Sequence, residues 1–177
     1  MMDKPQSNFS FRMMSLMLKI RDLFKPRAKV LEEAGIQQGE NVLDFGSGPG
    51  GYIKPLLKMI GPEGKIYALD MNPQAIRTIK NYILKNRITN IETILSDLKT
   101  GLADSSMDYV LLFDVLHHLK EPEAVLQELH RVLKDEGTFA MSDHHMDDEE
   151  IKKIIVDSGY FRLRTRGKNA FLFSRIV

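Results

Sequence analysis

The sequence predicts an α/β fold built on a doubly wound, mostly parallel sheet with an antiparallel hairpin at its C-terminal end. From residue 41 onward, short apolar segments typical of strands alternate with amphipathic segments typical of helices. The segment at 109–113 is almost wholly apolar, as in a strand whose two faces are both covered. Two strand-like segments around a short turn end the chain, which indicates a hairpin. Alternation of this kind favours parallel strands joined by helices.

Glycine, proline and capping residues delimit the individual elements. Helices are expected at residues 10–24, 27–34, 52–60, 73–85, 121–133 and 147–157, and strands at 41–45, 65–69, 91–95, 109–113, 138–142, 161–166 and 170–177. Asp147 is expected to cap the last helix, and residues 167–169 to form the hairpin turn. In the first hairpin strand Arg162, Arg164 and Arg166 occupy alternate positions, so they are expected to share one face.

The composition is that of an ordinary globular domain. The length of 177 residues fits one domain, and 43% of the residues are hydrophobic. The absence of cysteine excludes disulfides, thiolate metal sites and a cysteine nucleophile. A net charge of +1 lacks the basic excess of a nucleic-acid binder, and the apolar runs are too short to cross a membrane. The N-terminal residues lack the apolar core of a signal peptide, so a cytoplasmic location is expected.

A glycine-rich segment follows the strand expected at 41–45, where the chain turns into a helix. It reads VLDFGSGPGG from residue 42 to residue 51. In one frame, Gly46, Gly48 and Gly51 match the G-x-G-x-x-G fingerprint of dinucleotide-binding folds. In another, the segment matches the D-x-G-x-G-x-G pattern of enzymes that bind S-adenosylmethionine (SAM), through Asp44, Gly46, Gly48 and Gly50. The spacing alone leaves both ligand classes open.

The charge of the segment favours SAM over a dinucleotide. A pyrophosphate requires bare N–H groups and a positive helix end, and the carboxylate of Asp44 would repel it. SAM carries a sulfonium and an ammonium group, which that carboxylate would attract. No lysine or arginine lies between Asp44 and Tyr52 to offset the acid.

Two further acids follow the next strands along the chain. Asp70 ends the strand expected at 65–69, where a carboxylate can accept hydrogen bonds from both ribose hydroxyls of an adenosine. This role fits NAD and SAM alike. Asp97 follows the strand at 91–95 and could accept a hydrogen bond from an adenine amino group.

Several segments occur in the order and spacing of the motifs of a known family. They are the glycine segment VLDFGSGPGGY, then IYALDMN, LSDLKTG and FDVLHHLKEPEAVLQELHRVLKDEGTF. These segments, within residues 41–142, resemble the class I SAM-dependent methyltransferases, especially the small group that includes quinone-biosynthesis and arsenite methyltransferases. The resemblance implies a seven-stranded sheet with a reversed seventh strand.

The resemblance also implies a SAM site at the carboxyl ends of the strands. The residues expected to bind the cofactor are Asp44, Gly46, Ser47, Gly48, Gly50, Asp70, Met71, Asp97, Leu98 and Asp114. The glycine segment would hold the methionine part, Asp70 the ribose, and Asp97 with Leu98 the adenine. Asp114 would lie near the transferred methyl group.

One domain is expected over residues 1–177, with an N-terminal helical cap at 1–40 and an α/β core at 41–177. Many relatives carry an extra segment over the acceptor. Here the link after Ser142 is short, so residues 9–34 are the one obvious candidate for a lid.

Histidines follow the strands at 109–113 and 138–142. Asp114, His117 and His118 are the candidate catalytic residues, because a histidine is a natural general base near neutral pH. The alternative is that the pair begins a helix, with one ring packed and one in solvent. His144 and His145 could join them and Asp143 at one rim as ligands of a transition metal. A polar loop is the simpler interpretation, and no metal is expected.

The sequence therefore predicts transfer of a methyl group from SAM to an unidentified small-molecule acceptor, with no nucleic-acid partner. Two alternatives stay open. One is a SAM-binding module without catalysis, or a partner subunit. The other, disfavoured by Asp44, is an NAD-dependent oxidoreductase.

Overall fold

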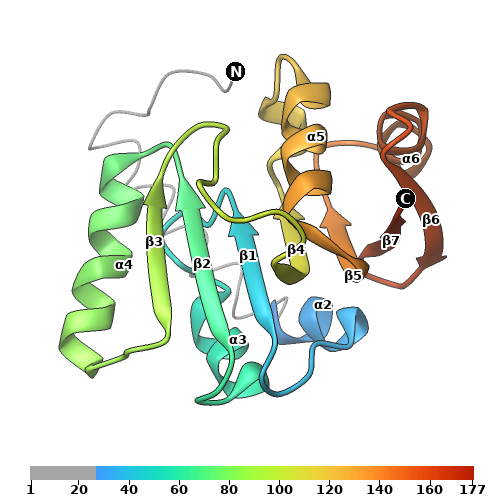
Figure 1. Ribbon diagram of the computed structural model, residues 1–177. Helices are drawn as coiled ribbons and strands as arrows, with labels where there is room; N and C mark the ends of the chain where they lie inside the picture. The colour runs from blue at the N-terminus through green and yellow to red at the C-terminus, as the bar shows by residue number, and fades with distance from the viewer. Residues whose placement is uncertain (1–26) are drawn as a thin grey trace.

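A computed structural model of the protein describes residues 27–177, and the sheet in it has the predicted α/β architecture (Figure 1). Seven strands lie in the order β3-β2-β1-β4-β5-β7-β6. Their bounds are β1 Asn41–Phe45, β2 Lys65–Asp70, β3 Ile91–Leu95, β4 Met107–Phe113, β5 Leu133–Ser142, β6 Phe161–Arg166 and β7 Phe171–Arg175. The strands from β3 to β5 pair in parallel, and β7 runs antiparallel to both β5 and β6. The reversed seventh strand and the terminal hairpin are thereby confirmed.

Helices cover both faces of the sheet (Figure 1). They are α2 Arg27–Ala34, α3 Ile53–Ile60, α4 Pro73–Asn86, α5 Pro122–Val132 and α6 Asp148–Asp157, with a short 3₁₀ helix at Leu116–His118. One hydrophobic core lies between the sheet and α2, α3 and α4, and a second lies between the sheet and α5 and α6. Successive side chains of a strand point to opposite faces, so the central strands contribute to both cores. Their near-continuous apolar sequences follow from this double burial.

The order of the strands reverses direction between β1 and β4. The chain passes from β1 outward to β2 and β3, and then returns to place β4 on the other side of β1. In open α/β sheets the crevice at such a switch point, beyond the carboxyl ends of the strands, is where ligands bind. The fold therefore brings the turn after β1 and the turn after β4 to the same place.

The predicted boundaries agree with the structure to within a few residues, with one larger difference. The strand expected at 138–142 begins at Leu133, because α5 passes directly into β5. The helix expected at 10–24 and the proposed lid lie outside the described residues. No helix within residues 27–177 is long and apolar enough to cross a membrane.

The expectation that the three arginines of β6 share one face is wrong. Arg162 pairs with Ser174 and Arg166 pairs with Phe171, and the register shifts between Leu163 and Thr165. Ser174 and Phe171 are an odd number of positions apart on β7, so their partners on β6 point to opposite faces. A β-bulge, which the alternation of the sequence does not reveal, causes the change.

A half-buried ion pair between Glu128 and Arg131 fastens α5 to the loop between β3 and β4. Glu128 accepts hydrogen bonds from the Thr100 backbone N–H at 2.8 Å and from the Arg131 guanidinium at 2.8 and 2.9 Å. Burial alone would raise the pKa of Glu128, but the hydrogen bonds from Arg131 and Thr100 outweigh it and lower the pKa to about 2. The ionised carboxylate therefore stabilises the folded state.

We expect Glu128→Gln to lower the free energy of unfolding at neutral pH by roughly 1–2 kcal/mol. This loss is smaller than the full pKa shift of Glu128 implies, because solvent screens the partly exposed Arg131. The stabilisation is present above the ordinary pKa of 4.5 and is lost as the pH falls toward about 2. Urea denaturation over this range should show the wild-type and variant stabilities converging in acid. Glu123→Gln, an exposed position on the same helix, is the control and should change little. A difference that stays constant with pH would contradict the assignment.

Candidate functional site

The turn after β1 is held against the end of β2 by three hydrogen bonds. The backbone N–H groups of Gly46 and Ser47 donate to the Leu69 carbonyl at 2.8 and 2.9 Å. The next N–H, of Gly48, donates to the Asp70 Oδ2 at 2.7 Å. The turn is therefore fixed by the neighbouring strand before the chain enters α3.

Positive φ angles explain the glycines of this turn. Gly46, Gly48 and Gly50 have φ of 78°, 53° and 86°, in the left-handed region that favours glycine. A Cβ on Gly46 would lie 2.3 Å from the Val115 side chain, so this glycine also allows the turn after β4 to pack closely. A Cβ on Gly48 would meet nothing within 4 Å among the described residues. The backbone at Gly48 is therefore open to close approach by a ligand.

Buried polar side chains surround the turn. Asp44, near the end of β1, is 2% exposed, and Ser47 is 4% exposed. The Ser47 hydroxyl makes no hydrogen bond within the described part of the chain. A buried hydroxyl of this kind costs free energy unless a ligand or water satisfies it. Together with the open backbone at Gly48, it fits a site for a polar ligand such as the methionine part of SAM.

Asp70 connects the glycine turn to the start of α4. Its Oδ1 accepts a hydrogen bond from the Asn72 N–H at 2.7 Å, while Oδ2 accepts the one from Gly48. Asn72 in turn caps α4 by accepting from the Gln74 N–H at 2.9 Å. Burial raises the pKa of Asp70 even though the two N–H donors act against the shift. Each carboxylate oxygen has a second lone pair, so the side chain can still accept from ligand hydroxyls.

The turn after β3 lies beside the end of β2. The Ser96 N–H donates to the Asp70 carbonyl at 3.2 Å, and the Leu98 N–H donates to the Ser96 hydroxyl at 3.2 Å. Asp97, Leu98 and Met71 are all half-buried. The residues expected to hold the ribose and the adenine thus follow adjacent strands at one edge of the sheet.

Asp114 begins the turn after β4 in a conformation that is unusual for a residue other than glycine. Its φ is 55°, and its N–H donates to the Ser142 carbonyl at 2.8 Å. One carboxylate oxygen accepts from the His144 backbone N–H at 3.2 Å and lies 2.7 Å from the ring Nδ1 of the same residue. The turns after β4 and β5 are therefore bonded to each other.

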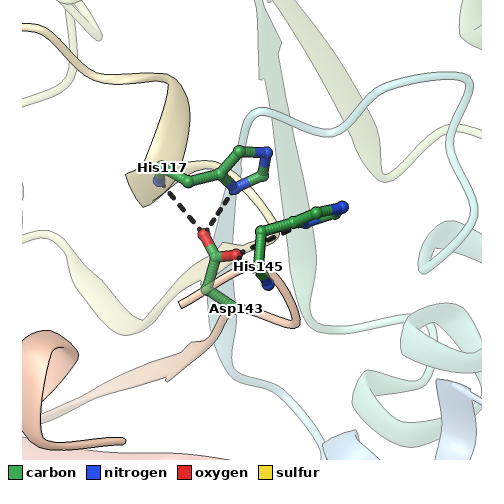
Figure 2. A group of neighbouring side chains, drawn as sticks. All are labelled: His117, Asp143 and His145. Atoms are coloured by element: carbon green, nitrogen blue, oxygen red, sulfur yellow. Dashed lines mark hydrogen bonds and ion pairs between the residues drawn. The ribbon is translucent and has the colours of Figure 1, made fainter. Parts of the chain in front are cut away.

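His117 is bonded to Asp143, a residue that the sequence offered as a possible metal ligand but not as a catalytic or cofactor-binding residue (Figure 2). The Asp143 Oδ2 lies 2.8 Å from the His117 Nδ1 and accepts from the His117 backbone N–H at 3.2 Å. The rings of His118 and His145 lie 3.8 and 4.3 Å from that of His117, measured between centroids. The position of Asp143 directly after β5 was the one signal of its role in the sequence.

The rings of His117, His118 and His145 thus come together, whereas the expectation that His117 and His118 begin a helix is wrong. His117 and His118 end a short 3₁₀ helix, with His117 half-buried and His118 exposed. Asp147 caps α6, as predicted, by accepting from the Glu150 N–H. Among residues 27–177, His117, Asp143 and His145 form a group whose ligand atoms lie within 4.8 Å of one another. The expectation that no metal binds there stays a prediction.

Comparison with known protein families identifies the fold. A family model described as a methyltransferase domain matches residues 36–166. The chain belongs to this methyltransferase family. Membership confirms the predicted family and its fold, with SAM as the cofactor of the domain.

Individual methyltransferases show the same relationship. A SAM-dependent methyltransferase of Aquifex aeolicus is 30% identical, with a TM-score of 0.75 and coverage of 90% of this chain and 97% of that one. The arsenite methyltransferase of Halobacterium salinarum is 32% identical over 62% of this chain and 28% of its own length. The demethylmenaquinone methyltransferase of Geobacillus stearothermophilus is 28% identical over 70% of this chain and 53% of its own length. The chain thus spans about half, or less, of these two curated relatives.

We expect Gly46→Ala to destabilise the methyltransferase domain more than Gly48→Ala. Both substitutions place a Cβ on a residue with positive φ, at a cost of about 1–2 kcal/mol. Only the Cβ on residue 46 meets Val115, and overpacking adds about 1–3 kcal/mol. Thermal and urea denaturation measure the difference. Val115→Ala should recover part of the loss in the Gly46→Ala background and none in the Gly48→Ala background. Equal losses for the two single variants would contradict this account.

Proposed function

We propose that the protein transfers a methyl group from SAM to a small-molecule acceptor. The arrangement that carries the proposal is the pair of buried carboxylates, Asp44 and Asp70, near the ends of β1 and β2 around an open glycine turn. Carboxylates attract the ammonium and sulfonium groups of SAM and repel the pyrophosphate of a dinucleotide. Family membership supports the same choice.

Three parts of the cofactor are assigned to three turns. Asp44, Gly46, Ser47, Gly48 and Gly50 would hold the methionine part, Asp70 and Met71 the ribose, and Asp97 and Leu98 the adenine. Asp114 would lie near the methyl group, because the turn after β4 packs against Gly46 through Val115. SAM supplies an already activated methyl group when bound, so the work of the protein is mainly to align donor and acceptor.

The acceptor side is assigned to the turns after β4 and β5. Asp114, His117 and His118 are the proposed catalytic residues, since they follow β4 at the switch point where the acceptor must approach the methyl group. The curated relatives are named for arsenite and demethylmenaquinone, which supports a small acceptor over a macromolecule. The net charge of +1 supports the absence of a nucleic-acid partner. A cytoplasmic location and one domain over residues 1–177 complete the proposal.

The first test compares ligands. SAM and S-adenosylhomocysteine should stabilise the protein, and NAD and NADP should not, at equal concentration in thermal-shift and calorimetric titrations. A ligand at a hundred times its dissociation constant adds about 2.7 kcal/mol to the free energy of unfolding. Asp44→Asn should weaken SAM, because it removes the charge that attracts the cation. Glu63→Gln, in the exposed turn before β2 at the opposite edge, is the matched control. Stabilisation by NAD and not by SAM would favour the oxidoreductase.

The second test concerns Asp70. Asp70→Asn removes acceptor capacity toward the ribose and also weakens the bond to the Gly48 N–H. With about 1.5–3 kcal/mol for each hydrogen bond to a charged group, SAM affinity should fall roughly tenfold to a hundredfold. Because burial raises the pKa of Asp70 and ribose hydroxyls favour its charged form, wild-type affinity should also fall as the pH is lowered through that pKa. The variant should lack this dependence. An unchanged affinity in calorimetry would remove Asp70 from the site.

A further inference from the structure

The turns after β4 and β5 are joined by two acid–imidazole pairs, and each turn contributes the acid of one pair and the imidazole of the other. The β4 turn supplies Asp114 to His144, and the β5 turn supplies Asp143 to His117. In each case one carboxylate oxygen accepts from the backbone N–H of the histidine and lies within hydrogen-bonding distance of its Nδ1. The two pairs fix the turns against each other at the switch point.

The two pairs differ in how deeply they are buried. The side chain of Asp143 is 0% exposed and that of His117 is 18% exposed. The side chains of the other pair, Asp114 and His144, are both more exposed than those of the first. Water therefore has less access to the pair of Asp143 and His117. Hydrogen bonds and charge interactions are stronger where water is excluded.

The contacts of Asp143 determine which nitrogen of His117 can act as a base. An ionised carboxylate only accepts hydrogen bonds, so the Nδ1 at 2.8 Å must carry the proton. The lone pair of the neutral ring then lies on Nε2. A third N–H, from the His145 backbone at 3.0 Å, holds the other carboxylate oxygen. Asp143 is thereby fixed in place, and its negative charge would stabilise His117 when the ring gains a proton.

The pair also lies near the place where the methyl group would be presented. His117 is two residues beyond Val115, whose side chain packs against Gly46 in the glycine turn. Asp143 directly follows β5, which pairs with β4 in parallel up to Phe113 and Ser142. The ring is partly exposed and therefore accessible to a ligand.

We propose that Asp143 positions His117 as a general base, and that the acceptor is a phenol- or enol-type hydroxyl compound. The proposal rests on the methyl-transfer function. An acceptor that already offers a free lone pair, such as a tertiary amine, needs no base. A hydroxyl acceptor does, because its oxygen carries a positive charge after methylation unless the proton leaves.

The proposed step balances as follows. The acceptor oxygen forms a bond to the methyl carbon, and the bond from that carbon to the sulfonium sulfur breaks with its electron pair left on sulfur. The hydroxyl proton passes to the Nε2 of His117. The products are the methyl ether, S-adenosylhomocysteine and an imidazolium beside Asp143, which returns the proton to water.

The distances favour a hydrogen-bonded pair over a metal site made from His117, Asp143 and His145. Ligand atoms around a tetrahedral zinc ion with bonds of about 2.0–2.1 Å are about 3.3 Å apart. The Asp143 Oδ2 and the His117 Nδ1 are closer, at 2.8 Å. The same oxygen also accepts a hydrogen bond from the His117 backbone N–H, and a metal ion cannot donate such a bond.

The first experiment reads the tautomer directly. Long-range ¹⁵N–¹H spectra of the full chain distinguish a ring protonated at Nδ1 from one protonated at Nε2, with His117→Gln used to assign the signals. We expect neutral His117 to carry its proton on Nδ1, and Asp143→Asn to abolish that preference. His145→Gln should preserve it, because residue 145 contributes its backbone N–H to Asp143 and its side chain is 63% exposed. A proton on Nε2 in the wild type would overturn the proposal.

The second experiment uses acceptors that differ in their need for a base. The probes are phenol, which stays protonated at neutral pH, pentafluorophenol, which is ionised, and trimethylamine, which has no proton to lose. His117→Gln should lower the turnover of phenol by about a hundredfold or more and leave that of pentafluorophenol nearly unchanged. Asp143→Asn should likewise lower the turnover of phenol and leave that of pentafluorophenol nearly unchanged. His145→Gln should change the turnover of neither phenol. Equal losses with both phenols would mean a structural role and would overturn the proposal.

Two other results would also overturn it. One is turnover of trimethylamine with no turnover of either phenol. The other is a stoichiometric metal that survives dialysis, is lost in His145→Gln and is needed for turnover. Both leave the proposed function intact, because SAM still binds and transfers its methyl group. Failure of SAM to bind in the calorimetric titration would instead be failure of the proposed function.

Discussion

The hydrogen bond from the Gly48 N–H to the Asp70 carboxylate joins the turn after β1 to the end of β2. The shape of the proposed cofactor site depends on this bond. The same carboxylate holds the Asn72 N–H, and Asn72 caps α4. One side chain thus sets the path of the glycine turn, the start of a helix and the proposed ribose contact. Burial at this position removes water from the Asp70 carboxylate, which disfavours its charged form and raises its pKa.

Buried acids at one edge of the sheet give the domain its chemical character. Asp44, Asp70 and Asp143 all lie within one residue of the carboxyl ends of their strands, and all are buried. Burying a carboxylate is unfavourable unless N–H groups or cations compensate it. Backbone N–H groups provide much of that compensation for Asp70 and Asp143. A carboxylate buried at these positions is unfavourable for the stability of the fold, which supports a functional reason for the three acids.

The sequence predicted the features that depend on local pattern. Apolar strands covered on both faces and the glycine turn could be located because each has its own composition. Three features could not be predicted, because they depend on which strands become neighbours. They are the bulge at Arg164, the continuation of α5 into β5, and the bond between Asp143 and His117. The last joins residues 26 positions apart, and nothing local in the sequence distinguishes a buried Asp143 from a solvated loop acid.

The switch point between β1 and β4 separates two kinds of chemistry. On one side, the turns after β1, β2 and β3 present acids and open backbone, which suit a cationic cofactor with ribose hydroxyls. On the other side, the turns after β4 and β5 present imidazoles paired with carboxylates, which suit proton transfer. Val115 against Gly46 is the contact that joins the two sides. Methyl transfer requires donor and acceptor in line, so a close contact between the turn proposed to hold the cofactor and the turn proposed to accept the proton would serve the reaction.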